Sequence, residues 1–304
     1  MNADWIAKRA VAAMLIELSS SPKPGNIDRC HDYEDIGFQE FLISTVAVYP
    51  VFRKAALGGY RMGQLLFEAV RSWQEFGLPG NTHFGSMALL IPLAMAAAGP
   101  VSASISASTS ESLSRSAHSS SPSHGDLRDE LCRVLESTTV EDSVDFYRAF
   151  QLSGARVAEV AEFSLKDADS VQELYLQEKT LLELMKLSSG HDLIAMEWST
   201  SFARSFKLSE RLVENVASYG RNLGVVRTYL EALSSQPDSL VQAKFGRKKA
   251  IEASARAGAV LVDWSLESIR SLDREFLDED LNPGSTADII AASIFIALIK
   301  GLIF

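Results

Sequence analysis

The sequence has few of the residues that mark several common classes of protein. Its two cysteines, Cys30 and Cys132, stand far apart and form no CxxC pair, so their spacing indicates neither a zinc ribbon nor a redox disulfide. The 29 basic residues are outnumbered by 39 acidic ones, and the net charge of −10 speaks against a general nucleic-acid binder. P-loop, HExxH, Rossmann glycine and GxSxG patterns are missing, which excludes the enzyme classes that these motifs identify.

Long apolar runs are also scarce. The N-terminal stretch is interrupted by Lys8, Arg9 and Glu17, and it lacks the cleavage site of a secretory signal. The final 16 residues, 289–304, are nearly all apolar except for Lys300, but a bilayer span needs roughly 20. We therefore expect a buried terminal helix, no membrane span and a cytoplasmic location. A membrane-associating tail is the alternative.

Apolar residues at helical spacing are what the sequence does have. Of its 304 residues 47% are apolar, which is enough for a core without disulfides. The 3.6-residue period is clear in 3–18 and in 38–56, where Pro50 should kink the helix or start a new turn. Further helices are expected at 60–76, 84–98, 126–136, 141–152, 171–187, 191–206, 209–233, 244–270 and 285–302. We predict an all-α fold, a multi-helix bundle or orthogonal array with a central cleft.

Residues 101–125 interrupt this helical pattern. Half of positions 101–124 are Ser, and Pro122 and Gly125 close the run, which is typical of a flexible surface insert. Helices of the same kind follow, so we expect residues 1–304 to form a single helical domain that contains the insert. Two weak strand candidates, 101–105 and 157–163, do not change this interpretation.

Three short polar segments carry the candidate chemistry, and the first is residues 21–35. Its prolines, Pro22 and Pro24, prevent helix continuation, and Gly25 permits unusual backbone angles. Closely spaced carboxylates suit Mg²⁺, and neighbouring cations suit phosphate oxygens. A proline turn followed by an acidic helix start explains the same residues without a ligand. The polar candidates in this segment are Lys23, Asn26, Arg29, His31, Asp32, Glu34 and Asp35.

The second polar segment is residues 79–85, Pro-Gly-Asn-Thr-His-Phe-Gly. Asn81 or Thr82 is expected to cap the helix that begins near His83. A helix start preceded by Gly can hold an anion, and His83 can contact a phosphate or transfer a proton. An ordinary capped turn is the alternative.

The third polar segment is residues 278–288, Asp-Glu-Asp-Leu-Asn-Pro-Gly-Ser-Thr-Ala-Asp. Ser285 or Thr286 is expected to cap the last helix, with Asp288 in its first turn, and capping alone accounts for these residues. If Asp288 instead faces a cleft, it is a metal ligand or a base. A basic run at 244–249 is either a phosphate contact or a solvated helix face.

Taken together and in order, the three polar segments resemble the triphosphoribosyl-dephospho-CoA synthase family. Its motifs correspond here to Glu17-Leu18 before the Pro-Lys-Pro-Gly turn at 22–25, and to an acidic cluster with a His at 31–35. They continue with Phe38 and Ser44, the Asn-Thr-His-x-Gly element at 81–85, and an Asn-Pro-Gly-Ser-Thr-Ala-Asp element at 282–288. The last of these looks most like the stand-alone archaeal-type members. The resemblance covers most of the chain outside 101–125.

The resemblance implies an all-α transferase that takes ATP and 3′-dephospho-CoA. The ribose 2′-hydroxyl of dephospho-CoA attacks C1′ of ATP, adenine leaves, and a triphosphoribosyl group is transferred. Such chemistry needs Mg²⁺ and cations at the triphosphate, a base for the hydroxyl and an acid at adenine. Two departures bear on the substrate. Phe84 stands where bacterial members have Lys, and Tyr33 stands where their acidic cluster has a middle Asp.

These observations lead to one main hypothesis, a Mg²⁺-dependent transferase that uses a nucleotide and dephospho-CoA. The expected catalytic residues are His31, Glu34 and Asp35, and the expected metal ligands are Glu34, Asp35 and Asp288. The expected substrate contacts are Lys23, Asn26, Arg29, Asn81, Thr82, His83, Asn282 and Thr286. One alternative is a related enzyme for another nucleotide or phosphoribosyl substrate. The other is a non-catalytic helical binding protein or homodimer that docks through its C-terminal helix.

Overall fold

The computed structural model describes residues 2–33, 36–78, 82–99, 124–154 and 170–304. Within these ranges the chain is helical, and the backbone forms no strand apart from an isolated β-bridge between Asp28 and His31. The all-α prediction is therefore confirmed. Glu34, Asp35, Asn81, both strand candidates and most of the Ser-rich insert lie outside the described residues. The helices are α1(Ala3–Ser19), α2(Phe38–Ala47), α3(Tyr49–Leu57), α4(Met62–Glu75), α5(Phe84–Ala97), α6(His124–Glu136), α7(Val140–Ser153), α8(Ser170–Leu176), α9(Leu181–Ser188), α10(Leu193–Ser199), α11(Ala203–Ser235), α12(Ser239–Phe245), α13(Arg247–Val262), α14(Leu266–Asp278) and α15(Gly284–Ile299).

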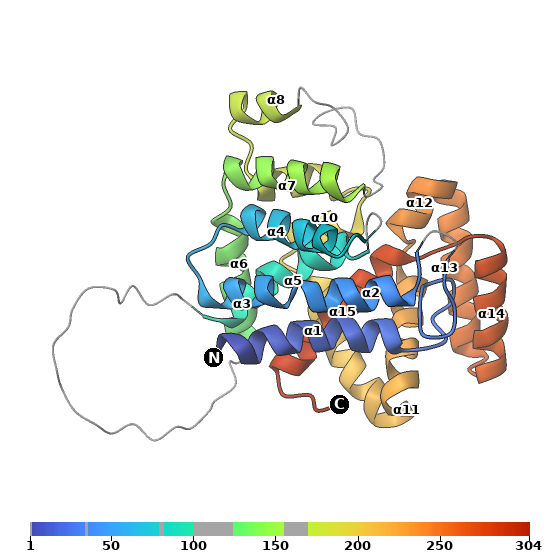
Figure 1. Cartoon of the computed structure of the whole chain (residues 1–304). Helices are drawn as coiled ribbons and strands as arrows, with labels where there is room; N and C mark the ends of the chain where they lie inside the picture. Colours follow the sequence, from blue (N-terminus) through green and yellow to red (C-terminus); the bar gives the residue numbers. More distant parts are fainter. Residues whose placement is uncertain (1, 34–35, 79–81, 100–123, 155–169) are drawn as a thin grey trace, which may run out of the picture.

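The C-terminal helix α15 lies in the middle of the molecule. It packs against α11, α1 and α5, and every residue from Ile289 to Ile299 is buried. An apolar helix that is buried all round needs partners on every side, and these three helices provide them. The predicted buried terminal helix is confirmed (Figure 1). The alternative that this helix docks a partner is wrong, because its apolar side chains are already enclosed.

Several expected helices are divided, each at a recognisable local signal. Pro50 lies in the first turn of α3, and the break from α2 falls at Val48, as the sequence predicted. The expected helix 171–187 ends at Leu176 and resumes after a capping box formed by Thr180 and Glu183. The expected helix 191–206 ends at Ser199. The expected helix 244–270 is three helices, because the backbone turns at Gly246 and again near Ser265, which caps α14.

The polar loop that follows α1 lies beside a group formed by α12, α13 and α14 (Figure 1). A hydrogen bond from the Gly25 amide to Asp273 Oδ1, 3.0 Å long, fastens the loop to α14. Gly25 has a positive φ of 72°, and a Cβ there would overlap the carbonyl oxygen of Leu281. The turn of the first polar segment is therefore pressed against the third polar segment, and only glycine fits.

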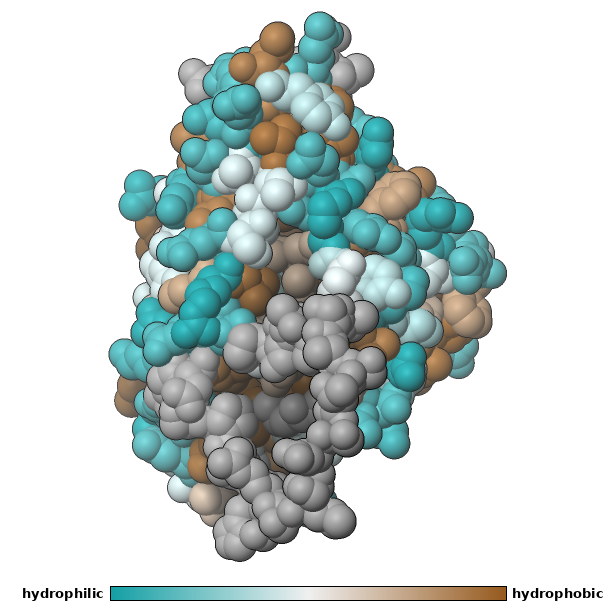
Figure 2. Space-filling model, turned by 90° about the vertical axis from the view of Figure 1, so that its left-hand side faces the viewer, coloured by the Kyte–Doolittle hydropathy of each residue, from teal (hydrophilic) through white to brown (hydrophobic). Residues whose placement is uncertain are grey.

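The outer surface differs from this apolar centre. The face in Figure 2 is mostly hydrophilic, with hydrophobic residues scattered among polar ones. None of the helices in the described part of the chain is long and apolar enough to cross a membrane.

Candidate active site

Lys23, in the Pro-Lys-Pro-Gly turn, is completely buried. Its ammonium group donates to the carboxylate of Glu17 on α1 and to Asn26 Oδ1, at 2.7 Å from the latter. Burial raises the pKa of Glu17, and the positive charge of Lys23 opposes that rise. The sequence predicted Lys23 as a substrate contact. In the fold its charge is neutralised by Glu17, and the ammonium group fixes the side chain of Asn26.

A hydrogen bond between two asparagines joins the first and third polar segments. Asn26 Nδ2 donates to Asn282 Oδ1 over 2.9 Å, and both residues keep part of their amide group for other partners. Tyr33 closes the same turn, since its hydroxyl donates to the Gly25 carbonyl at 2.5 Å. Burial raises the pKa of Tyr33, so the phenol stays protonated and remains a donor. Tyr33 therefore supports the turn where relatives are expected to have an aspartate.

His31 lies between two carboxylates, one in its own loop and one on α14. Its Nδ1 is 3.6 Å from Asp28 Oδ1 and 3.9 Å from Asp273 Oδ2. Asp28 is itself held in place, because its oxygens accept from the amides of Lys23 and Cys30 at 3.0 and 2.8 Å. The other ring nitrogen, Nε2, is buried with no partner among the described residues. An imidazole with carboxylates at one nitrogen and a free second nitrogen can carry a proton to or from a ligand.

His83 begins helix α5 and is buried against α2. Its Nε2 is 3.0 Å from Thr45 Oγ1 and 3.2 Å from the carbonyl oxygen of Phe41, and the two rings of His83 and Phe41 meet edge to face. Burial lowers the pKa of His83 to about 4, against the opposing effect of the Phe41 carbonyl, and the charge of Lys23 lowers it further. The imidazole is therefore neutral at pH 7.

The residue before His83 keeps hydrogen-bonding capacity that the described residues do not use. Thr82 Oγ1 is buried with no partner among them, and the His83 side chain makes no cap bond to α5. A hydroxyl beside a helix N-terminus is well placed to contact an anion. Phe84 points elsewhere, because it packs edge to face on Phe146 and Phe150 of α7. The aromatic at position 84 therefore belongs to the core between α5 and α7.

Asp288 joins the second and third polar segments. Ser86 Oγ, in the first turn of α5, donates to Asp288 Oδ1 at 2.5 Å, and a Cβ on Gly85 would overlap Asp288 Oδ2. Enclosure raises the pKa of Asp288 to about 8, with smaller contributions from the negative charges of Glu17 and Asp238. The residue nevertheless keeps some exposed surface. Asp288 is therefore a carboxyl group that holds its proton near pH 7 at the junction of α5 and α15.

Thr286 is used inside the protein. Its amide and its hydroxyl both donate to Asp238 Oδ2, at 2.7 and 2.8 Å, while Asp238 Oδ1 accepts from Leu240 and Val241 at the start of α12. One buried carboxylate thus caps two helices. Thr286, expected as a substrate contact, orients α15. Arg29 by contrast is exposed, with no ion pair among the residues that the structure describes.

The described carboxylates were tested against the requirements of a metal ion. No group of three His, Cys, Asp or Glu residues in the described ranges is arranged to hold one. Mg²⁺ commonly uses one or two protein carboxylates and takes its remaining ligands from water and substrate phosphates. Asp288 fits such a role, because one of its oxygens has no side-chain donor and the residue reaches the surface. Binding would require loss of its proton.

Sequence reasoning missed several residues of this arrangement. Glu17 appeared only as part of a motif, and Ser86 and Asp273 were not considered. Ser86 follows the Asn-Thr-His-x-Gly element by one residue, so the position of Asp288 in the opposite helix was needed to reveal it. Asp273 lies on an ordinary amphipathic helix, and nothing in the pattern of α14 distinguishes it from a solvated acid.

Comparison with known proteins gives a family match and structural matches. Residues 3–303 match the family model described as ATP:dephospho-CoA triphosphoribosyl transferase. The structure is similar to that of a protein from Archaeoglobus fulgidus described as a triphosphoribosyl-dephospho-CoA synthase, with a TM-score of 0.67 and 27% sequence identity. That similarity covers 86% of this chain and 99% of the other. No curated protein matches the sequence. The family match includes all three polar segments.

Proposed function

The chain belongs to the ATP:dephospho-CoA triphosphoribosyl transferase family, and we propose from this premise that its three polar segments form the site of the transfer. The chain is thus a transferase that moves a triphosphoribosyl group from ATP to dephospho-CoA, as the resemblance in the sequence predicted. The observation that supports the location is the meeting of all three segments around Asp288 and the Asn26–Asn282 bond.

The balance of the reaction defines what the protein must provide. A bond forms between the ribose 2′-oxygen of dephospho-CoA and C1′ of ATP, while the bond from C1′ to adenine breaks and adenine keeps the electron pair. The hydroxyl loses a proton, and adenine gains one from solvent. In our proposal His31 Nε2 accepts the hydroxyl proton, because Asp28 and Asp273 hold its other nitrogen and stabilise the resulting imidazolium.

Substrate binding is assigned to groups that the protein leaves available. Thr82, whose hydroxyl has no partner among the described residues, contacts phosphate oxygens together with Asn81 and Arg29. Asn26 and Asn282 use their remaining amide capacity on the ribose or the phosphates. His83 contacts the substrate through a hydrogen bond and not through charge, because its imidazole is neutral. Lys23 and Thr286 act as positioning residues, since their polar groups are occupied by Glu17, Asn26 and Asp238.

We further propose that Mg²⁺ is held by Asp288 together with Glu34 and Asp35. When bound, Mg²⁺ would neutralise charge on the triphosphate. Because the pKa of Asp288 is about 8, this carboxyl must lose its proton as the metal binds. The proposed location is the cytoplasm, which is consistent with Cys30 and Cys132 both being free thiols.

The test is release of adenine from ATP, followed by chromatography, with and without dephospho-CoA and with Mg²⁺ added or chelated. We expect adenine release only when both dephospho-CoA and Mg²⁺ are present. Asp35→Ala should lower the rate on the order of 100-fold, whereas Asp129→Ala, which removes an exposed carboxylate on α6, serves as the control. Unchanged turnover in Asp35→Ala would remove this residue from the site. Full activity under chelation would exclude the metal.

A further inference from the structure

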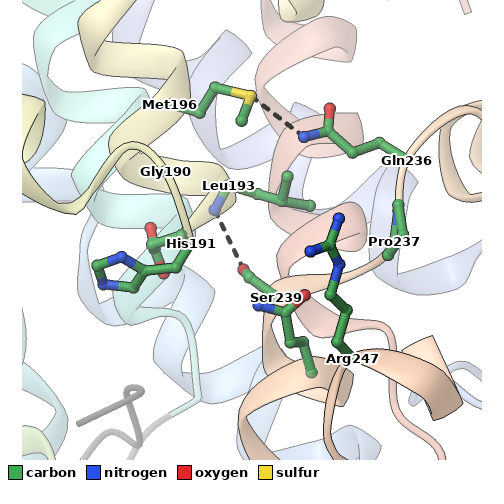
Figure 3. Close-up of a pocket in the computed structure, with 10 residues that line it drawn as sticks. Gly190, His191, Leu193, Met196, Gln236, Pro237, Ser239 and Arg247 are labelled. Carbon is green, nitrogen blue, oxygen red and sulfur yellow. Dashed lines mark hydrogen bonds between the residues drawn. The ribbon is translucent and has the colours of Figure 1, made fainter. Parts of the chain in front are cut away.

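A cavity lies apart from the residues described above. Its volume is about 220 Å³, and it is formed by the turn before α10, the connection between α11 and α12, and the first residue of α13. In Figure 3 the guanidinium group of Arg247 extends into the middle of this space, between Leu193 and Pro237. The roles proposed above for the three polar segments do not use this cavity.

Arg247 brings an uncompensated positive charge to the cavity. No carboxylate among the described residues forms an ion pair with it, although the protein carries a net charge of −10. The other cations of the basic run differ, since Lys244 pairs with Asp280, and Lys249 pairs with Glu252 and Glu279. The first turn of α13 contains no acidic residue. An unpaired arginine at the edge of a cavity suits a phosphate group, which it can bind through two donors.

The remaining wall is unsuited to a large number of negative charges. Leu193, Met196 and Pro237 present apolar surface, and the side-chain amides of Gln236 and Gln242 provide neutral donors and acceptors. A triphosphate would need several cations to bind here. The one carboxylate of this wall, Asp192, would instead repel it. A chain in which methylene groups alternate with amides, and which begins at a phosphate, matches these walls better.

The start of α15 lies between the cavity and Asp288 of the candidate active site. Ser239 lines the cavity, accepts a hydrogen bond from the Leu193 amide at 3.2 Å, and donates to Ser285 Oγ at 2.8 Å. Ser285 precedes Asp288 by three positions on α15, so the two lie about one helical turn apart. A ligand that reacts near Asp288 can therefore extend a long arm around the start of α15 and into the cavity.

We propose that this cavity binds the pantetheine arm of dephospho-CoA, with Arg247 on the diphosphate from which the arm extends. This inference rests on the proposed function, because it takes dephospho-CoA as the acceptor. The pantetheine arm contains two amides separated by methylene groups and ends in a thiol, which corresponds to the amide and apolar walls. The cavity would thus select the acceptor and leave the binding of ATP to the three polar segments.

The test compares two neighbouring cations in steady-state kinetics. Arg247→Ala should raise KM for dephospho-CoA about tenfold, as expected for loss of a charge-assisted hydrogen bond, without a matching rise in KM for ATP. Lys248→Ala is the matched control, because Lys248 is exposed, adjacent and outside the cavity wall. Gln236→Leu should raise KM for dephospho-CoA about threefold to tenfold through loss of an amide contact. A rise in KM for ATP instead, equal effects of Arg247→Ala and Lys248→Ala, or no effect would overturn the inference.

A binding measurement separates failure of this inference from failure of the proposed function. Calorimetry with 4′-phosphopantetheine, which has the arm and a phosphate but no nucleoside, should show binding to the wild-type protein and weakening of about tenfold in Arg247→Ala. If the wild-type protein releases no adenine yet binds this probe through Arg247, the proposed reaction fails and the cavity assignment stands. If adenine is released normally but the probe does not bind, the cavity assignment alone fails.

Discussion

The starts of α5 and α15 look alike in the sequence, but the fold places their threonines in different environments. Each contains a Pro-Gly pair with a Thr two residues later, at 79–82 and at 283–286, and each reads as a capped turn. At α15 the amide and hydroxyl of Thr286 both donate to Asp238, so both donors of this threonine are used inside the protein. At α5 Asp288 accepts hydrogen bonds from the amide and the hydroxyl of Ser86, whereas the Thr82 hydroxyl is buried with no partner among the described residues.

This difference separates a structural helix start from one that can bind a ligand. A buried polar group without a partner costs folding free energy, and such groups are uncommon unless something else satisfies them. The hydrogen bonds of Thr286 therefore hold the start of α15, which carries Asp288, while in our proposal Thr82 contacts phosphate. The four predictions below test this division between support and binding.

The largest effect is expected at the carboxyl that both helix starts approach. Asp288→Asn keeps the shape and the hydrogen bond from Ser86 but removes the ionisable group, so turnover should fall on the order of 100-fold or more. The rate of adenine release measures this change. Far-ultraviolet circular dichroism and the melting temperature should stay close to those of the wild type. Loss of folding, or turnover within a factor of two of the wild type, would mean that Asp288 supports the fold and takes no part in the reaction.

The second prediction concerns the support of α15. Asp238→Ala removes one buried carboxylate that accepts four hydrogen bonds from α12 and α15, two of them from Thr286. Loss of two helix caps should lower the free energy of unfolding by about 2–4 kcal/mol. Urea denaturation measures it. Asp192→Ala, which removes a single cap on α10, is the comparison and should cost about half as much. Equal losses of unfolding free energy in the two variants would show that a carboxylate capping two helices stabilises the fold no more than one capping a single helix.

How much of this arrangement the sequence predicts depends on the range of the interactions. The period of apolar residues located α1, α5 and α15, and the motifs named Asn26, Asn282 and Asp288 as site residues. The sequence could not show that Thr286 is capped by Asp238, because this bond joins residues 48 positions apart. Glu17 and Lys23 are close in the sequence, but the proline turn between them had to be seen before their ion pair could be recognised. Whether a polar residue supports the fold or binds the substrate is decided by partners that the fold brings to it.

The pH dependence of stability provides a third prediction. The pKa of Asp288 is about 8 in the fold and 3.8 without it, so the folded state binds more protons than the unfolded state between these values. Stability from this group is therefore greatest at low pH and falls as pH rises through about 4 to 8. Asp288→Asn should show a shallower decline in melting temperature than the wild type across this range. Parallel curves for the two proteins would show that Asp288 ionises normally.

The smallest change in stability is expected at Thr82, and it tests the comparison most directly. Because Thr82 Oγ1 has no partner among the described residues, Thr82→Val should alter the free energy of unfolding by no more than about 0.5 kcal/mol. Thr286→Val leaves an oxygen of the buried Asp238 with one donor fewer, and it should cost about 1–3 kcal/mol. In kinetics the order reverses, since Thr82→Val should raise KM for ATP about twofold to tenfold if its hydroxyl contacts phosphate. Were Thr82→Val to cost as much stability as Thr286→Val, the start of α5 would also be structural, and the phosphate contacts would have to lie elsewhere.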